Sequence, residues 1–214
     1  MADTPGKINQ QKLAHFLSLC RIRRLSARNT IIYAGESSTT LFYIVRGSVS
    51  VLIQDDKGHE MVVTYLNKGE FFGEMGLFDL DNLQQDRSAR VRTRTECELA
   101  EISYTQFHEL THEDPELLYA LCRQMAERLR KTTRKACDLA NLDVTGRIAR
   151  TLLELTQQPD SLSHPDGMQI KVSRQEVARL VGCSREMVGR VLKNLEDQNL
   201  ITVDGKTIVV YNSR

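Results

Sequence analysis

The apolar positions of this sequence follow two different periods. Between residues 30 and 105, short apolar runs alternate with polar or small residues, and Val49, Val51 and Ile53 are separated in this way by single residues. Turn-forming segments containing glycine, such as residues 55–58, interrupt these runs at close spacing. A period of two indicates half-buried strands, and many short strands between turns are typical of a sandwich or jelly-roll barrel. We therefore predict a β jelly-roll here.

Helical spacing appears on both sides of this region. Residues 8–20 are predicted to form a short amphipathic helix, because apolar side chains recur there three and four positions apart. A much longer helix is predicted from Asp114, a good N-cap, and Pro115, which suits a first helical position, to about Leu139. At about 1.5 Å per residue, a helix of this size is on the order of 37 Å long.

An apolar stripe with spacings of three, four and seven follows this long helix. Its members are Leu118, Leu121, Met125, Thr132 and Leu139. The stripe is longer than a small barrel can cover, so we expect a symmetric partner helix to cover it in a homodimer. The alternative is a helix that lies wholly on its own barrel.

The last third of the chain has a mixed pattern. It predicts a helix over 144–157, a link punctuated by proline and glycine from Pro159 to Gly167, a strand over 168–172, two short helices and a final hairpin that turns at residues 204–205. The predicted fold class is α+β. The predicted parts are a jelly-roll domain over 1–113, a dimerisation helix and hinge over 114–140, and a winged helix-turn-helix domain over 141–214, with the boundary at about 138–143.

The two short helices carry the strongest motif, at residues 173–195. Ser173 and Glu176 form a capping box for the first helix, Gly182 and Cys183 make a tight turn, and Ser184 caps the second helix. Two short helices that cross through a turn containing glycine are typical of the helix-turn-helix motif. The hairpin that follows would then be the wing.

One face of the second helix is apolar and the other is charged, at about 100° per residue. The charged face holds two arginines, a lysine and a glutamate around a glycine: Arg185, Glu186, Gly189, Arg190 and Lys193. Arginine can bond to guanine in the major groove, and glutamate can accept from cytosine N4. This face is predicted to read DNA; an ordinary solvated helix face is the alternative.

A second motif lies within the strand-rich region. Residues 71–76 read Phe-Phe-Gly-Glu-Met-Gly, and Arg87-Ser88-Ala89 follows. Gly73 can expose backbone N–H groups to an anion, and Arg87 can add a guanidinium for a phosphate. From spacing alone, a surface ion pair for Arg87 remains open.

These motifs together resemble a known family. Gly-Glu-Met-Gly-Leu-Phe at 73–78, followed by Arg-Ser-Ala, is similar to the phosphate-binding cassette of cyclic-nucleotide-binding domains. With residues 183–190, and with long matches at 142–147, 164–169 and 205–210, the chain is identified as a member of the bacterial cyclic AMP receptor protein (catabolite activator) family. The basic run at 130–135 and the loop at 79–86 resemble its virulence-factor-regulator branch.

The resemblance implies cyclic AMP as an allosteric ligand, and no metal. Gly73, Arg87 and Ser88 would hold the cyclic phosphate. Glu74 would accept from the ribose hydroxyl. The adenine would face Thr132 and Thr133, the latter reaching across from the partner subunit. The implied ligand-binding residues are Gly73, Glu74, Met75, Arg87, Ser88, Arg128, Thr132 and Thr133.

The resemblance also implies macromolecular partners. A two-fold symmetric operator on double-stranded DNA would be bound by Ser173, Arg174, Ser184, Arg185, Glu186, Gly189, Arg190 and Lys193. The loop at 161–169 would contact RNA polymerase, and Arg21 and Arg23 would keep the basic character of a second polymerase-contacting patch.

Three positions depart from the family's usual residues. Arg90 stands where tryptophan is usual, Asn141 where a hinge phenylalanine is usual, and Gln106 where the second polymerase patch has lysine. The change at Asn141 leaves open a regulator of the same fold that is independent of ligand, or one that responds to cyclic di-GMP or cyclic GMP. An enzyme is not expected, because no paired carboxylates, metal cluster or nucleophile–base pair accompany Arg87.

Composition supports a cytoplasmic protein. The 214 residues include 29 basic and 28 acidic side chains, and 41% are hydrophobic, which is ordinary globular composition. We find no apolar run near the ~20 residues of a membrane span and no secretory signal. Five cysteines without a CxxC pair suit a reducing compartment.

Overall fold

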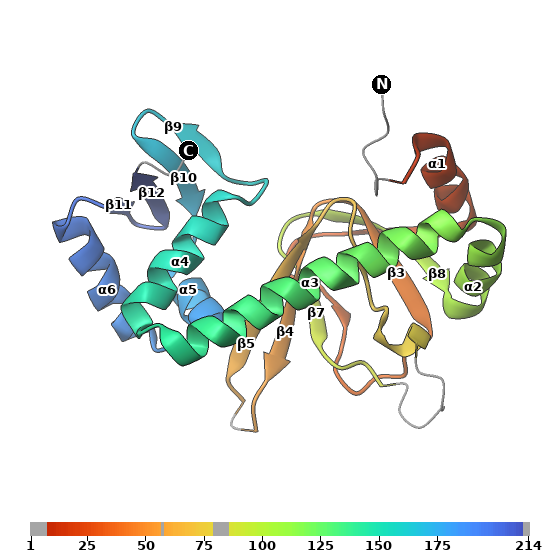
Figure 1. Ribbon diagram of the computed structural model, residues 1–214, viewed down its shortest axis with the longest axis horizontal. Coiled ribbons are helices and arrows are strands. Elements are labelled where there is room, and N and C mark those ends of the chain that lie inside the picture. Colours follow the sequence, from red (N-terminus) through yellow and green to blue (C-terminus); the bar gives the residue numbers. More distant parts are fainter. Residues whose placement is uncertain (1–7, 57, 79–85, 212–214) are drawn as a thin grey trace. The chain divides into compact units, whose positions relative to one another are not determined.

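The computed structural model describes residues 8–56, 58–78 and 86–211 (Figure 1). The chain forms two compact units. One comprises the chain up to residue 55 together with 62–132, and the other comprises 56–61 together with the chain from 133 onwards. Helices and antiparallel sheets both occur, which confirms the predicted α+β fold class.

Two four-stranded sheets form the N-terminal β-roll. The first has the order β1 (Arg21–Leu25), β8 (Cys97–Ser103), β3 (Thr40–Arg46) and β6 (Phe71–Phe72). The second has the order β2 (Thr30–Ile32), β7 (Arg90–Thr93), β4 (Ser48–Gln54) and β5 (Glu60–Asn67). Strand β1 lies outside the region predicted to be strand-rich. Four of its five residues are exposed, because it is an arginine-rich strand at a sheet edge.

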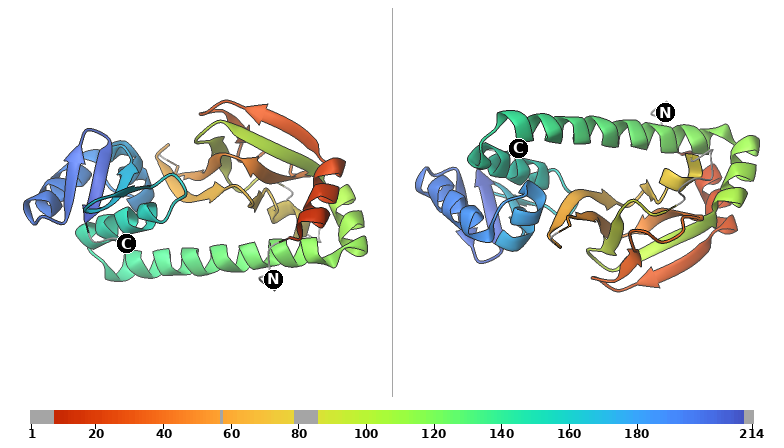
Figure 2. Two further views of the ribbon diagram at one scale, coloured as in Figure 1. Left: turned by 90° about the horizontal axis from the view of Figure 1, so that it is seen from above. Right: turned by 90° about the horizontal axis from the view of Figure 1, so that it is seen from below.

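Aromatic side chains fill one end of the β-roll. Phe16 of helix α1 (Gln10–Leu19) is fully buried and makes edge-to-face contacts with Tyr43, Phe71 and Phe107. Phe107 belongs to helix α2 (Tyr104–Glu113), and the two helices lie together at this end of the strands (Figures 1 and 2). Helix α2 was not predicted, although Ser103 and Gln106 form a capping box at its start.

The long helix α3 (Pro115–Asn141) begins as predicted and ends two residues later than predicted. The carboxylate of Asp114 accepts a hydrogen bond from the Glu116 amide at 3.1 Å, which satisfies one of the free N–H groups of the first turn. Helix α3 runs beside the strands of the β-roll in all three ribbon views (Figures 1 and 2).

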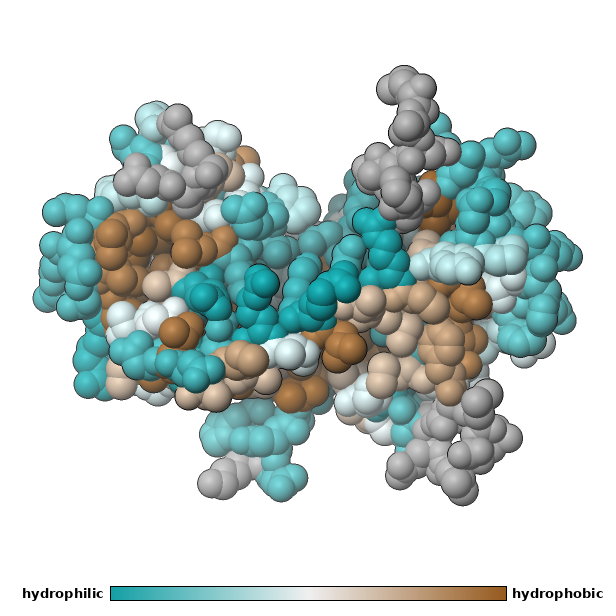
Figure 3. All heavy atoms as spheres, viewed as in Figure 1, coloured by the Kyte–Doolittle hydropathy of each residue, from teal (hydrophilic) through white to brown (hydrophobic). Residues whose placement is uncertain are grey.

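The predicted apolar stripe of α3 is in fact two stripes. Leu121 is fully buried in the aromatic core of the β-roll, so it is not available to a partner helix, whereas Met125 packs against that core and is only partly buried. Leu118 and Leu129, about 60° and 80° round the helix from Leu121, are exposed. The predicted seam was therefore wrong at Leu121, because the a/d spacing does not distinguish the face of α3 that packs on the β-roll from the exposed face beside it. Figure 3 shows apolar surface beside hydrophilic surface along this helix.

The C-terminal unit packs three helices on a small sheet. Its elements are α4 (Val144–Thr156), β9 (Leu162–His164), β10 (Gly167–Lys171), α5 (Arg174–Val181), α6 (Arg185–Asp197), β11 (Ile201–Asp204) and β12 (Thr207–Tyr211), and the sheet order is β11-β12-β10-β9. Strand β9 lies inside the predicted link from Pro159 to Gly167, where it pairs with β10. Asp143 caps α4, as predicted, by accepting from the Gly146 amide at 2.8 Å.

Within the described residues, no helix has the length and apolar character needed to cross a membrane.

Candidate functional site

Arg87 is held at its backbone by a turn of the β-roll. Its amide donates to the Glu36 carbonyl at 2.8 Å, and its carbonyl accepts from the Gly35 amide at 2.9 Å. Its guanidinium lies inside the protein, and the residue is only 9% exposed. The turn at residues 35–36 therefore fixes the backbone from which the buried, positively charged side chain of Arg87 extends.

Backbone oxygens hold the other end of this side chain. The guanidinium donates to the carbonyl of Gly73 at 2.9 Å and to the carbonyl of Thr40 at 2.8 Å. The hydroxyl of Tyr104, the first residue of α2, lies 3.3 Å from the same guanidinium and donates to the Gly73 carbonyl. Ser38 hydrogen-bonds to this hydroxyl in turn, at 2.6 Å.

Only glycine fits at position 73. Its φ of +79° lies in the left-handed region, which side chains disfavour. A Cβ atom there would lie 2.7 Å from a guanidinium nitrogen of Arg87. Gly73 thus allows the close approach between the two segments of the cassette, which we define as residues 73–78 and 87–89.

The charge of Arg87 is not matched by an acid. In the described parts of the chain it contacts carbonyl and hydroxyl oxygens but no carboxylate. Burying an unpaired charge is unfavourable, so this site favours an anion. Ser88 is exposed directly beside it, and Met75, at the start of the short helix η1 (Met75–Phe78), is 61% exposed.

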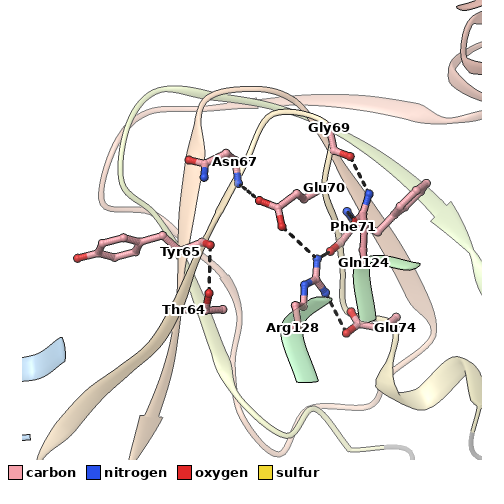
Figure 4. Close-up of polar contacts among 9 residues, drawn as sticks. All are labelled: Thr64, Tyr65, Asn67, Gly69, Glu70, Phe71, Glu74, Gln124 and Arg128. Carbon is pink, nitrogen blue, oxygen red and sulfur yellow. Dashed lines mark hydrogen bonds and ion pairs between the residues drawn. The ribbon is translucent and has the colours of Figure 1, made fainter. Parts of the chain in front are cut away.

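A second guanidinium reaches the cassette from α3 (Figure 4). Arg128 forms an ion pair with Glu74 at 3.1 Å, and it also donates to the Phe71 carbonyl. Glu70 lies further away, at 3.9 Å from the same guanidinium. Glu74 is itself buried, at 8% exposed, so its carboxylate depends on this partner.

The structure joins part of the predicted ligand set. Gly73 and Arg87 are in contact, as are Glu74 and Arg128. Thr132 and Thr133 are exposed on α3, about one turn beyond Arg128.

Sequence reasoning missed two residues of this region. Tyr104 is in a helix that was not predicted. Gln124 makes two hydrogen bonds to the β-roll, and its position in line with Leu117 and Leu121, on the face of α3 that covers the β-roll, is the signal that could have identified it. The loop at 79–85 lies outside the described residues.

The predicted helix-turn-helix is present in the C-terminal unit. Ser173 caps α5 by accepting from the Glu176 amide, and Ser184 caps α6 by accepting from the Met187 amide, both at 3.2 Å. Gly182 ends α5 with φ +72°. Burial raises the pKa of the Cys183 thiol in this turn, although the charge of Arg147 opposes the shift.

Helix α6 divides into two faces as predicted. Its buried side chains are Val188, Val191, Leu192 and Leu195. The exposed ones include two arginines, a glutamate and a lysine: Arg185, Glu186, Arg190 and Lys193. A Cβ at Gly189 would have the Arg174 side chain as its nearest neighbour, at 4.0 Å, which places Arg174 of α5 beside this face.

Comparison with known proteins matches both parts of the chain to known domains. A cyclic nucleotide-binding domain matches residues 22–114, and a Crp-like helix-turn-helix domain matches residues 146–213. The cAMP-activated global transcriptional regulator Vfr of Pseudomonas aeruginosa is 62% identical over 206 residues, which cover 95% of this chain and 96% of that protein. The chain belongs to the cyclic AMP receptor protein family. The cAMP-activated global transcriptional regulator CRP of Salmonella typhimurium is 57% identical, over 94% of this chain and 95% of that protein.

Solved structures of this family have the same fold. The c-di-GMP responsive global regulator CLP of Xanthomonas campestris superposes with a TM-score of 0.87 at 46% identity, covering 95% of this chain and 100% of that one. A CRP-family transcriptional regulator from Thermus thermophilus superposes with a TM-score of 0.76 at 25% identity, covering 89% of this chain and 92% of that one. The family predicted from the sequence is confirmed.

Residues that depart from the family pattern have local roles here. The side-chain carbonyl of Gln106 accepts from the Ser103 amide and hydroxyl, so Gln106 caps α2. Asn141 closes α3 by donating from its side chain to the Cys137 carbonyl at 2.8 Å. Arg90, half-buried, begins β7.

Proposed function

We propose that this protein is a cytoplasmic, homodimeric transcription regulator that binds cyclic AMP in its β-roll and a two-fold symmetric operator through α6. The observation that carries the ligand site is the buried guanidinium of Arg87, whose hydrogen bonds within the described chain go only to neutral oxygens. The relatives named above are transcription regulators and not enzymes.

The residues present fit a cyclic nucleotide. Arg87 supplies a buried charge for the phosphate, and Ser88, the next residue, is exposed. Glu74 can accept from a ribose hydroxyl while its carboxylate stays paired with Arg128. Thr132 and Thr133 offer hydroxyls, which can accept from the adenine amino group. When bound, the nucleotide supplies the anion that the Arg87 site lacks.

The dimer is proposed from the exposed stripe of α3. Leu118, Cys122 and Leu129 lie on one side of the helix, and Leu129 is 68% exposed. A second copy of the helix, packed along this stripe, would bury these side chains. Two copies of α6 would then read two half-sites about one DNA turn apart, at ~34 Å.

Contact with RNA polymerase is proposed for two surfaces. The loop at 161–169 includes Leu162, which is 60% exposed on strand β9. On the edge strand β1, Arg21 and Arg23 are exposed, although Arg23 pairs with Glu101 at 3.3 Å. Gln106 is not free to replace a lysine in this second patch, since it caps α2.

Operator binding under nucleotide titration tests this function. A fluorescent palindromic operator should bind tightly with saturating cyclic AMP and weakly without it, and the effect should exceed that of cyclic GMP at equal concentration. Equal binding with and without nucleotide would show a regulator that is independent of ligand.

The solved relative described as c-di-GMP responsive favours a second candidate. In this second candidate function, the protein binds the same kind of operator, but its ligand is cyclic di-GMP. Titration of the same operator with cyclic di-GMP beside cyclic AMP decides between the two, because only one of these nucleotides should change operator affinity at micromolar concentration.

A further inference from the structure

Strand β6 is an edge strand, and a side chain of α3 completes its outer edge. The strand comprises only Phe71 and Phe72, and it pairs with β3 on its inner side. On its outer side, the Gln124 side-chain oxygen accepts from the Phe71 amide at 2.8 Å, and its nitrogen donates to the Gly69 carbonyl at 2.9 Å (Figure 4). One amide side chain thus takes the place of a neighbouring strand.

The next turn of α3 continues this contact. Arg128, four residues after Gln124, donates to the carbonyl of Phe71. Both backbone groups of Phe71 are therefore bonded to α3, and the Phe71 side chain is fully buried in the aromatic core. Phe71 is therefore firmly held, and the cassette begins two residues after it, at Gly73.

The two side chains differ in what they bind. Arg128 also pairs with Glu74, a residue of the ligand site, so its contacts can change when a nucleotide arrives. Among the described residues, Gln124 bonds through its side chain only to main-chain atoms of Gly69 and Phe71. One of these bonds is accepted by Gln124 and the other is donated by it. Both can therefore form only at one position of α3 along its axis relative to β6.

We propose that Gln124 is a positioning residue for the nucleotide site, which sets the register of α3 against the cassette. Gln124, Arg128 and Thr132 follow one another at intervals of four, so one face of α3 presents them in order. With Gln124 locked on β6, Arg128 meets Glu74, and Thr132 is held one turn further along. A slip of α3 by one turn, about 5.4 Å, would separate Arg128 from Glu74.

This inference rests on the proposed function, since the site that Gln124 positions is the proposed cyclic AMP site. It assigns no contact between Gln124 and the ligand. Loss of its hydrogen bonds should therefore act on ligand affinity through Arg128 and Glu74.

The test compares Gln124→Met with Met125→Ala. Methionine keeps the length of glutamine and removes both hydrogen bonds, while Met125, the next residue, packs on the same core. Both variants are first checked for cooperative thermal unfolding. Calorimetric titration with cyclic AMP should then show about tenfold weaker binding by Gln124→Met, and affinity within about twofold of wild type for Met125→Ala.

A third variant separates positioning from simple stability. In Gln124→Glu the carboxylate can accept from the Phe71 amide but repels the Gly69 carbonyl, whereas its protonated form can donate to that carbonyl again. Its cyclic AMP affinity relative to wild type should therefore rise as the pH falls from 7.5 towards the ordinary pKa of a glutamate carboxyl, about 4.3. Gln124→Met should show no such recovery.

The failure of this inference can be told from failure of the proposed function. If wild type does not bind cyclic AMP, the proposed function is wrong, and amide hydrogen exchange in ligand-free protein still tests the contact, because the Phe71 amide should exchange faster in Gln124→Met. If wild type binds cyclic AMP and Gln124→Met binds it equally well, Gln124 does not position the site.

Discussion

Arg128 of α3 and Glu74 of the cassette form an ion pair of 3.1 Å in which the two side chains are only 18% and 11% exposed. Residues 54 positions apart in the sequence are therefore joined at the proposed ligand site. Because both ions are largely withdrawn from water, removing one partner leaves the other poorly solvated, and such a loss is larger than for an exposed pair.

Glu74→Gln should weaken cyclic AMP binding. The amide keeps the shape of the carboxylate but loses the charge that holds Arg128, and a hydrogen bond to a charged group contributes about 1.5–3 kcal/mol. The expected loss is at least about tenfold by calorimetry. Glu70→Gln is the matched control: Glu70 lies 3.9 Å from the same guanidinium, and its contact with the Asn67 amide needs only an acceptor. Equal effects of the two changes would contradict a specific role for Glu74.

Tyr104→Phe should loosen Arg87 without unfolding the β-roll. The change removes one hydroxyl that contacts Ser38, the Gly73 carbonyl and the Arg87 guanidinium, and leaves the ring in place. We expect cyclic AMP affinity to fall about three- to tenfold, since a neutral hydrogen bond contributes about 0.5–1.5 kcal/mol. Calorimetry with a parallel thermal melt measures both effects. An unchanged affinity would mean that the two carbonyls alone hold Arg87.

The elements that were predicted well have strong local signals. Asp114 and Pro115 mark the start of α3, and Ser173 and Ser184 cap the two helices of the helix-turn-helix. The residues of each capping interaction are only two or three positions apart, so such an interaction can be identified from the sequence alone.

The elements that were missed lack a clear apolar period, even where a local signal such as the capping box of α2 is present. Helix α2 buries only Phe107 and Leu110, too few for a clear period, and strand β1 is mostly arginine. The pairing of Gln124 with Phe71 joins residues 53 positions apart. Periodicity identifies an apolar face but not its partner, and for that reason Leu121 was assigned to a dimer seam.

The corrected stripe predicts different outcomes for two leucines of α3. Leu129→Glu puts a charge on a side chain that is 68% exposed, so the β-roll should stay folded while sedimentation shows a monomer. Leu121→Glu buries a charge in the core and should instead lower the melting temperature steeply. In Leu129→Glu the Cys122 thiol should also react faster with a maleimide, because the partner helix no longer covers it. A dimer that survives Leu129→Glu would place the interface elsewhere.

Thiol reactivity should separate buried from exposed cysteines. Burial raises the pKa of Cys20 to about 12, and its thiol donates to the Phe16 carbonyl. Because the thiolate is the reactive form, labelling of Cys20 at pH 8 should be far slower than that of the exposed Cys137. The folded state holds this proton more tightly than the unfolded state, so the contribution of Cys20 to stability is lost as pH rises from about 9 towards 12. Mass spectrometry after timed alkylation gives the rates, and equal rates would contradict the raised pKa and partial burial of the Cys20 thiol.

Base reading and phosphate binding should be separable on the C-terminal unit. Glu186 projects from the exposed first turn of α6, where a recognition helix meets base edges, while Arg174 opens α5. A good base contact discriminates by about 1–3 kcal/mol, or roughly 5- to 150-fold. Glu186→Ala should therefore relax the preference at one base pair in each half-site and leave non-specific binding unchanged or slightly stronger, since an acid has left a phosphate-rich surface.

Arg174→Ala should behave as the loss of a phosphate contact. Its affinity should drop alike for all operator sequences, and the slope of log affinity against log salt should shrink by about 0.9 per phosphate lost, or about twice that for a dimer. The measurement is a panel of single-base operator variants titrated at two salt concentrations with saturating cyclic AMP. If Glu186→Ala weakens every operator equally and keeps the wild-type order of preference, Glu186 does not read a base. A wild-type salt slope in Arg174→Ala would show that Arg174 does not contact a phosphate, because a variant that neutralises fewer phosphates must release fewer counterions on binding DNA.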